Sequence, residues 1–396
     1  MPVFTQLETR DSKLETRIGI NAQKLSTSES YRSAGTSRYV FNLLRQIRAL
    51  DAPEHYIAYL SDAHIPPELS QTERFSLKPS RWPTGSASMR VLWEQLRLPR
   101  ILRHDRITLF HGAVNALPLA WRGPSVVTIL DLTFLRMPGA FGRSNRAYLR
   151  SMVRAAARRA DRIIAISEAT RQDVIRFLQV APEKVVTVYC GVEPRYQPLA
   201  DRPGVAELRE KYDLPDRFIL YLGTIEPRKN LIRLVDAYAA LRRKRVTDWP
   251  LLLVGGRGWG YEAILDRVAG SGVADAIRFV GFVPEHEMPL WYNAAALFVY
   301  PSGYEGFGLP VLEALASGTP SVVSDRSSLP EVAGNAAVLV DPTDVQAIAN
   351  GMERVLEDAS LRSRLAHEGP RQASRFTWQR MAEETVSIYR SVITHS

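Results

Sequence analysis

Short apolar runs alternate with helix-like segments along almost the whole chain, and this alternation restricts the fold more than any other feature. The runs are rich in Val, Ile, Leu and aromatic residues, as in RIGIN, SVVTIL, FILYL and LFVY. Strands of this kind that alternate with helices are typical of parallel β-sheets whose faces are covered by helices. A chain of 396 residues is long enough to form two such units, each with its own core.

The apolar runs fall into two series, which predict two Rossmann-like domains. The first series of predicted strands covers residues 16–23, 55–61, 107–112, 124–131, 161–167 and 184–189, and the second covers residues 217–223, 251–256, 276–282, 295–301 and 320–325. A stretch rich in proline and charge separates the two series. We therefore expect a flexible extension over residues 1–16, a first domain over 17–195, a connection over 196–216 and a second domain over 217–375.

Composition places the chain among soluble proteins of a reducing compartment. Hydrophobic residues make up 45% of the chain, and no run of eighteen apolar residues predicts a transmembrane helix. The polar N-terminus lacks the apolar segment of a secretory signal. Cys190 is the single cysteine and follows an apolar run, so we expect a buried structural thiol and a cytoplasmic protein.

The net charge of +9 is distributed unevenly between the two halves. Residues 1–200 hold 29 Lys and Arg against 17 Asp and Glu, a balance of +12, and residues 201–396 hold 22 against 25, a balance of −3. The basic half includes an arginine-rich helix from Arg150 to Arg162. This face is either simply solvated or attracted to an anionic membrane. We expect no nucleic-acid partner, because no recognised nucleic-acid-binding module accompanies the charge.

The segment from Tyr300 to Pro320 has the composition of a ligand-binding turn. It places Glu305 in a glycine-rich turn between an apolar strand and a helix, and Glu313 follows eight residues later. Unpaired N–H groups at the start of a helix suit a phosphate, and glycines allow a ligand to approach the backbone closely. The two carboxylates would then be free to hydrogen-bond hydroxyl groups, which indicates sugar chemistry. A pair of merely solvated glutamates is the alternative for a bare Glu-x7-Glu spacing.

The whole pattern resembles the Glu-x7-Glu signature of retaining glycosyltransferases of family four, which have the GT-B fold. The resemblance implies that Glu305 contacts the donor-sugar hydroxyls, that Glu313 holds the nucleotide ribose, and that the backbone of Phe307, Gly308 and Leu309 meets sugar and phosphate. It covers nearly the whole chain from about Ile18. It also implies that a final helix within residues 376–396 crosses back to the first domain.

Loops after three other strands of the second half are expected to complete the donor site. Arg228 and Lys229 lie at a helix start, where cations are unfavourable unless an anion is bound, and the resemblance makes them ligands of the donor diphosphate. Many family members carry Arg where this chain has Thr224.

Two further predicted contacts are backbone contacts to the nucleotide. We interpret Gly255 and Gly256 as allowing the nucleotide to lie against the backbone, although glycine loops alone are weak signals. The resemblance places the nucleotide base beside Phe282 and Val283.

The first half is expected to supply the acceptor side of the site. Gly35 ends a loop that resembles the family's glycine-rich loop and would approach the donor phosphates. His111 at a strand end is a candidate hydrogen-bonding or acid/base group, with a satisfied structural histidine as the alternative. Related enzymes often have His-Asp-Leu where this chain has Leu130, Asp131 and Leu132.

These motifs predict a retaining glycosyltransferase without a metal or other cofactor, because no Asp-x-Asp motif stands in the expected place. Within the family, GTxEPRKNL and SSLPEVAGxAA are most similar to bacterial mannosyltransferases that build O-antigen, capsule or exopolysaccharide. GDP-mannose is the preferred donor, and a polyprenyl-diphosphate-linked glycan is the expected acceptor, with peripheral contact to the anionic inner membrane. A UDP-sugar-dependent transferase and a non-catalytic nucleotide-sugar-binding protein remain alternatives.

Overall fold

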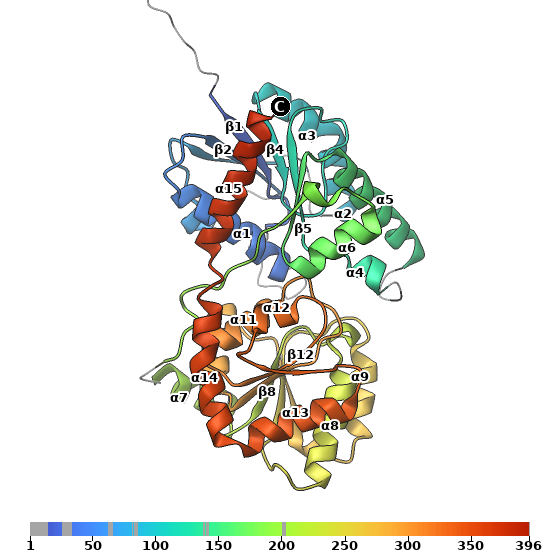
Figure 1. Cartoon of the computed structure of the whole chain (residues 1–396), viewed down its shortest axis with the longest axis vertical. Coiled ribbons are helices and arrows are strands. Elements are labelled where there is room, and N and C mark those ends of the chain that lie inside the picture. Colours follow the sequence, from blue (N-terminus) through green and yellow to red (C-terminus); the bar gives the residue numbers. More distant parts are fainter. Residues whose placement is uncertain are drawn as a thin grey trace, which may run out of the picture.

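The computed structural model describes residues 15–25, 34–61, 66–80, 82, 86–137, 139, 142–199 and 203–395. These residues form two lobes, each built around a parallel β-sheet flanked by helices (Figure 1). Nearly all of the predicted N-terminal extension, and the beginning of the glycine-rich loop before Gly35, lie outside the described residues.

The N-terminal sheet is entirely parallel in the described residues, with the strand order β3-β2-β1-β4-β5-β6-β7. Its strands are β1 Arg17–Asn21, β2 His55–Leu60, β3 Phe75–Pro79, β4 Leu109–Gly112, β5 Ser125–Ile129, β6 Arg162–Ala165 and β7 Val185–Thr187. The helices are α1 Ala34–Ala49, η1 Pro67–Leu69, α2 Ala87–Leu92, the π-helix η2 Trp93–Arg97, α3 Leu98–His104, α4 Thr133–Arg136, α5 Arg143–Arg159, α6 Glu168–Leu178 and η4 Pro182–Lys184.

The C-terminal sheet is also parallel, with the order β10-β9-β8-β11-β12-β13 among the residues described. Its strands are β8 Ile219–Leu222, β9 Leu251–Val254, β10 Ile277–Gly281, β11 Leu297–Tyr300, β12 Ser321–Ser324 and β13 Val338–Val340. The helices are α7 Pro203–Tyr212, η5 Pro227–Lys229, α8 Leu231–Arg243, α9 Tyr261–Ala269, η6 Ala274–Ala276, η7 Glu285–Glu287, α10 Met288–Ala294, α11 Leu309–Ala316, α12 Leu329–Ala333, α13 Val345–Glu357, α14 Ala359–Ala373 and α15 Trp378–Thr394.

Two strands and one helix were absent from the sequence prediction, for identifiable reasons. β3 and β13 are edge strands with partly exposed side chains, so neither has the continuous apolar run of a central strand. The predicted connection over residues 196–216 contains α7, whose Val205 and Leu208 are buried. Tyr212 at the end of α7 packs against Trp291 of α10 with ring centroids 5.1 Å apart, so this helix is anchored on the C-terminal lobe.

The last helix crosses back to the N-terminal lobe, which confirms the predicted arrangement. α15 lies along α1 on the N-terminal lobe (Figure 1). The Tyr389 side chain is fully buried there, and its hydroxyl lies 2.6 Å from Nδ1 of His111 in β4. Arg390 forms two hydrogen bonds with the Glu54 carboxylate, at 2.7 and 3.1 Å. The C-terminus therefore belongs structurally to the N-terminal core.

Replacing Tyr389 by Ala tests how much the packing of α15 stabilises the N-terminal lobe. Deleting a fully buried aromatic ring leaves a cavity and is expected to lower the free energy of unfolding by about 3–5 kcal/mol. Urea unfolding followed by circular dichroism measures the change. Glu383→Ala, on the exposed face of the same helix, is the matched control and is expected to shift stability by less than about 0.5 kcal/mol. A Tyr389→Ala protein as stable as this control would contradict the assigned docking of α15.

Candidate active site

A cleft of about 720 Å³ lies between the two lobes, where the carboxyl ends of both sheets face each other. Its N-terminal wall includes the start of α1 and the segments after β5 and β6, and its C-terminal wall consists largely of the loops after β8, β9, β10 and β11. The volume is in the range of small-molecule sites. All predicted site residues except His111 line this cleft: Gly35, Arg228, Lys229, Gly255, Gly256, Phe282, Val283, Glu305, Phe307, Gly308, Leu309 and Glu313.

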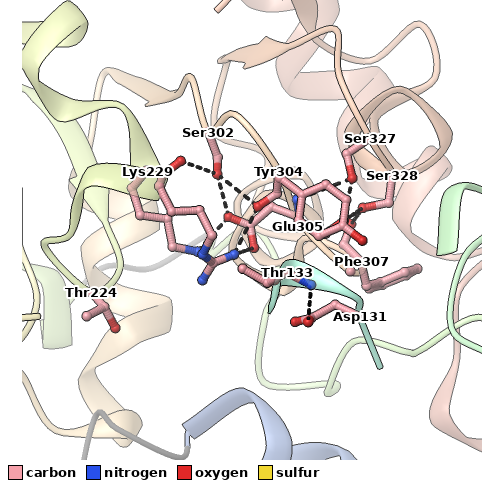
Figure 2. Close-up of polar contacts among 12 residues, drawn as sticks. Asp131, Thr133, Thr224, Lys229, Ser302, Tyr304, Glu305, Phe307, Ser327 and Ser328 are labelled. Atoms are coloured by element: carbon pink, nitrogen blue, oxygen red, sulfur yellow. Dashed lines mark hydrogen bonds and ion pairs between the residues drawn. The ribbon is translucent and has the colours of Figure 1, made fainter. Parts of the chain in front are cut away.

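Glu305 forms the centre of a buried polar cluster on the C-terminal wall (Figure 2). Its Oε1 accepts hydrogen bonds from Lys229 Nζ at 2.5 Å, from Ser302 Oγ at 2.7 Å and from the Tyr300 hydroxyl at 3.1 Å. Its Oε2 accepts from Arg228 Nη1 at 2.9 Å. The loops after β8 and β11 are thereby joined through one carboxylate.

The environment of Glu305 keeps its carboxyl ionised at neutral pH. Burial alone would raise its pKa, but the charges of Arg228 and Lys229 outweigh burial and lower the pKa to about 2. Burial and the neighbouring Arg228 lower the pKa of Lys229, whereas Glu305 opposes this. Glu305 is therefore unsuited to donate a proton as a general acid near pH 7.

The expectation that both glutamates are free to bind hydroxyl groups is wrong, because both carboxylates pair with cations. Glu313 is almost fully buried on α11, and its Oε1 lies 2.5 Å from a guanidinium nitrogen of Arg38 on α1. Its Oε2 accepts a hydrogen bond from the Tyr292 hydroxyl at 3.1 Å. Burying a carboxylate without a partner would cost free energy, which explains why both glutamates form ion pairs with cations.

Arg38 also contacts two further acidic residues and was not singled out from the sequence. Its guanidinium lies 3.6 Å from Glu193 and 3.4 Å from Glu285. Burial opposes its charge, but the three carboxylates together raise its pKa well above the ordinary value. Arg38 lies three residues after Gly35, at the cleft end of α1, so its place after a glycine-rich loop was the available signal.

The glycines of the Glu305 turn are required by close contacts and by backbone conformation. A Cβ at Gly306 would lie 2.1 Å from the carbonyl oxygen of Leu130 in the other lobe. Gly308 has φ +105°, and a Cβ there would meet Leu329 at 2.5 Å. Gly306 therefore allows the lobes to touch, and Gly308 allows the turn to enter α11.

Hydrogen bonds between the lobes surround this turn. The carbonyl of Gly306 accepts hydrogen bonds from Ser167 Oγ at 2.7 Å and Thr170 Oγ1 at 3.1 Å. The Glu331 carboxylate accepts from the backbone N–H groups of residues 168 and 169, both at 2.7 Å, at the start of α6. Ser167 caps the start of α6 through its side chain, and the same hydroxyl group also joins the lobes.

The side of the cleft formed by the loops after β9 and β10 carries two exposed aromatic side chains. Phe282 is 43% exposed and Val283 is buried, and Gly255 and Gly256 lie on the adjacent loop. Trp259 on the same loop also lines the cleft and is 45% exposed, and it was not singled out from the sequence. Exposed aromatic rings offer flat faces on which a base can stack.

His111 does not face the cleft, so its predicted acid/base role is wrong. The side chain is fully buried, with Nε2 2.8 Å from Thr128 Oγ1 and Nδ1 2.6 Å from the Tyr389 hydroxyl. Burial lowers its pKa to about 3, so the ring is neutral at physiological pH. His111 is the structural histidine that fastens α15 to the N-terminal sheet.

The two departures from the family pattern both lie in the cleft. Leu130 is nearly buried and packs its backbone against Gly306, and Asp131 accepts a hydrogen bond from the backbone N–H of Thr133 at 2.9 Å. Thr224 lines the wall beside Arg228. Figure 2 shows Asp131 of the N-terminal lobe below the Glu305 cluster of the C-terminal lobe.

No helix among the described residues combines the length and apolar character needed to cross a bilayer. Across the same residues, no group of three or more His, Cys, Asp or Glu side chains is placed to hold a metal ion.

Comparisons with known proteins agree with the two-lobed architecture. The family described as Glycosyltransferase Family 4 matches residues 33–196, and Glycosyl transferases group 1 matches residues 205–372. The O-antigen chain mannosyltransferase B of Escherichia coli is 34% identical over 290 residues, which cover 73% of this chain and 76% of that protein. The serotype-specific mannosyltransferase WbdA of Escherichia coli is 34% identical over 243 residues, which are 60% of this chain but 30% of that protein.

The solved structures show the same fold at low sequence identity. Sucrose-phosphate synthase from Thermosynechococcus elongatus superposes with a TM-score of 0.77 at 22% identity, covering 96% of this chain and 100% of that chain.

The ion pairs of Glu305 predict a pH-dependent contribution to stability. Because the pKa of Glu305 in the folded protein is about 2, below the ordinary 4.5, the ionised carboxylate stabilises the fold above pH 4.5. This stabilisation is lost as the pH falls from about 4.5 towards 2. Glu305→Gln is expected to lower the free energy of unfolding by about 3 kcal/mol at pH 7.

Urea unfolding at pH 7, 4.5 and 3 measures this difference, which should shrink as the pH falls. Glu368→Gln, in a solvent-exposed pair with Arg364, controls for the loss of one carboxylate and should change stability little at any of these pH values. A Glu305→Gln difference that stays constant across this range would reject the assigned ion pairing.

Proposed function

The chain belongs to glycosyltransferase family 4, and we propose that it transfers mannose from GDP-mannose, with retention of configuration, to a growing bacterial surface polysaccharide. The observation that carries this proposal is the cluster of Glu305, Arg228 and Lys229 on one wall of an interlobe cleft. Such a cluster offers cations for a diphosphate and a carboxylate for sugar hydroxyls within one buried network.

The choice of mannose rests on the relatives rather than on the cleft residues. The relatives at 34% identity include the O-antigen chain mannosyltransferase B, which is covered over 76% of its length. The base would lie beside Phe282 and Val283, with its ribose at Glu313 and its diphosphate between Arg228 and the start of α11. Glu313 can accept two ribose hydroxyls only after giving up part of its contact with Arg38.

The proposed mechanism assigns leaving-group stabilisation to Arg228 and Lys229. As the bond between sugar and diphosphate breaks, negative charge grows on the phosphate oxygens, and the two cations and the amides before α11 stabilise it. Glu305, whose low pKa keeps it ionised, would bind sugar hydroxyls and stabilise positive charge on the sugar. Departure and attack on the same face of the sugar would retain the configuration, with the leaving phosphate accepting the acceptor proton.

This assignment requires neither a metal ion nor another cofactor for charge stabilisation. Contacts between the lobes at Gly306 and Glu331 would limit entry of water and so limit hydrolysis of the donor. Transfer measured in excess EDTA should therefore equal transfer with added Mg²⁺.

Binding of GDP and GDP-mannose is the direct test of the donor. Calorimetry on the full chain should give saturable binding of both, with UDP and UDP-glucose binding at least tenfold more weakly. Glu313→Gln should weaken the binding of GDP about tenfold or more, because a carboxylate that accepts hydrogen bonds from the ribose hydroxyls makes charge-assisted hydrogen bonds. Glu357→Gln, an exposed glutamate of α13 in the same lobe, is the matched control and should bind as wild type.

Three results would revise this proposal in different ways. Preference for the uracil nucleotides would replace the donor but keep the reaction. Binding of GDP-mannose without turnover on any acceptor would favour a non-catalytic nucleotide-sugar-binding protein. Wild-type affinity in Glu313→Gln would remove Glu313 from the ribose site.

A lipid-linked acceptor and peripheral membrane contact form the second part of the proposal. Arg143, Arg150 and Arg158 of α5 are exposed and recur at intervals of about two helical turns, so they share one face. Leu92 and Leu96, on α2 and η2, are exposed by 42% and 56%. Cations beside exposed apolar side chains suit an anionic membrane surface.

The membrane contact predicts salt-sensitive binding to anionic vesicles. Each cation near such a surface contributes about 1 kcal/mol, so replacing Arg143, Arg150 and Arg158 by Ser should weaken binding to phosphatidylglycerol vesicles about tenfold or more. Co-sedimentation at low and high salt measures this. Replacing Arg243, Lys244 and Arg245 by Ser removes the same charge from the other lobe and should have little effect. Equal binding to neutral phosphatidylcholine vesicles, independent of salt, would contradict the proposed contact.

A further inference from the structure

A second group of polar side chains lies on the carboxyl edge of the N-terminal sheet, outside the residues that line the cleft. Asn21 ends β1, and its side-chain amide donates a hydrogen bond to Oε1 of Glu94 in the π-helix η2. Asn21 is 7% exposed, whereas Glu94 is half-buried. Ligands of open parallel sheets bind at this edge, so the pair occupies a place where function is expected.

The π-helix is fixed across two strand ends. Trp93 at its start is buried in the core, and the side chain of Gln95 forms hydrogen bonds with the segment that follows β4. Gln95 Nε2 donates to the carbonyl of Leu117 at 3.1 Å, and its Oε1 accepts from the N–H of Leu119 at 2.9 Å. Single π-helical turns are rare and frequently mark functional sites. Here the turn directs Glu94 towards β1 while Gln95 holds the loop after β4.

The surroundings of Glu94 differ from those of Glu305 and Glu313, which line the cleft. No cation forms an ion pair with its carboxyl group among the described residues, and the amide of Asn21 is its hydrogen-bond donor there. Burial raises the pKa of Glu94, and the charges of Arg90 and Lys24 oppose this from nearby. With one hydrogen bond from Asn21 to its Oε1, this carboxyl group keeps capacity to accept hydrogen bonds from a ligand.

The chemistry of the pair suits a sugar. A carboxyl group and an amide can hydrogen-bond neighbouring hydroxyls of a sugar. The pair of Glu94 and Asn21 therefore has the chemistry of a carbohydrate subsite.

The distance from the donor cleft suits the acceptor rather than the donor. The order β1-β4-β5 places β1 two strands from β5, and Leu130 and Asp131 after β5 line the cleft. Neighbouring strands lie about 4.8 Å apart, so the end of β1 is about 10 Å from that of β5. A sugar bound at Glu94 would thus lie beside the donor site on the same edge.

We propose that Glu94 and Asn21 form a subsite that binds a sugar of the acceptor glycan. This inference rests on the proposed transferase function, because only a glycan acceptor gives the subsite a place in the reaction. Glu94 binds and positions the acceptor, and no proton transfer is assigned to it.

Glu94→Gln is the informative variant, because it keeps the size of the side chain and removes its charge. Binding of methyl α-mannoside, methyl α-glucoside and methyl α-galactoside to GDP-saturated protein is followed by saturation-transfer NMR. At least one glycoside should bind wild type, and Glu94→Gln should bind it about tenfold more weakly. The thermal midpoint and the affinity for GDP should remain those of wild type. Glu183→Gln is the matched control, since Glu183 precedes β7 at the opposite edge of the same sheet.

The other possible outcomes would contradict either the subsite or the donor assignment, and they distinguish the two. Equal glycoside binding by wild type and Glu94→Gln, or no glycoside binding by wild type, would overturn the subsite. A lower thermal midpoint with unchanged glycoside affinity would show that Glu94 is structural. Loss of glycoside binding in Glu94→Gln, combined with no affinity of wild type for GDP-mannose, would reject the donor while retaining the subsite.

Discussion

The buried carboxylate of Glu305 is the interaction on which the geometry of the cleft depends. Two cations from the loop after β8, one hydroxyl from the end of β11 and one from the loop after β11 converge on its two oxygens. Its backbone carbonyl is held as well, by the hydroxyls of Ser327 and Ser328. Because a buried charge is stable only when its partners are in place, loops that are far apart in sequence are fixed relative to one another.

The same turn sets the approach of the two lobes. Gly306 follows Glu305 directly, and its carbonyl accepts both hydroxyl groups from the start of α6. Its missing side chain leaves room for the backbone of Leu130. The carboxylate that organises the C-terminal wall of the cleft and the carbonyl that joins the lobes thus belong to neighbouring residues of one turn. Any shift of this turn would move both walls of the cleft together.

The sequence predicted the elements that are central in each sheet and the loops that follow them. Continuous apolar runs identify buried parallel strands, and strand ends identify the ligand edge, so Arg228, Gly255 and Glu305 could be placed in the cleft. Ion pairs between distant segments leave no such pattern. Arg38 meets Glu313 only because the two lobes close, and His111 is covered by a helix that lies 278 residues later. A strand-end histidine looks the same in sequence whether solvent or a crossing helix lies above it.

Both glutamates of the family signature form ion pairs with cations, and this bears on how a donor would bind. A sugar hydroxyl is a weaker partner for a carboxylate than a guanidinium or an ammonium group, so hydroxyls alone could not displace Arg228 or Lys229 from Glu305. A diphosphate could, because it offers the cations an anion of higher charge. The exchange would leave Glu305 open to the sugar just when the cations hold the leaving group. The ion pairs of Glu305 thus hold Arg228 and Lys229 together on the wall of the cleft where a diphosphate would bind.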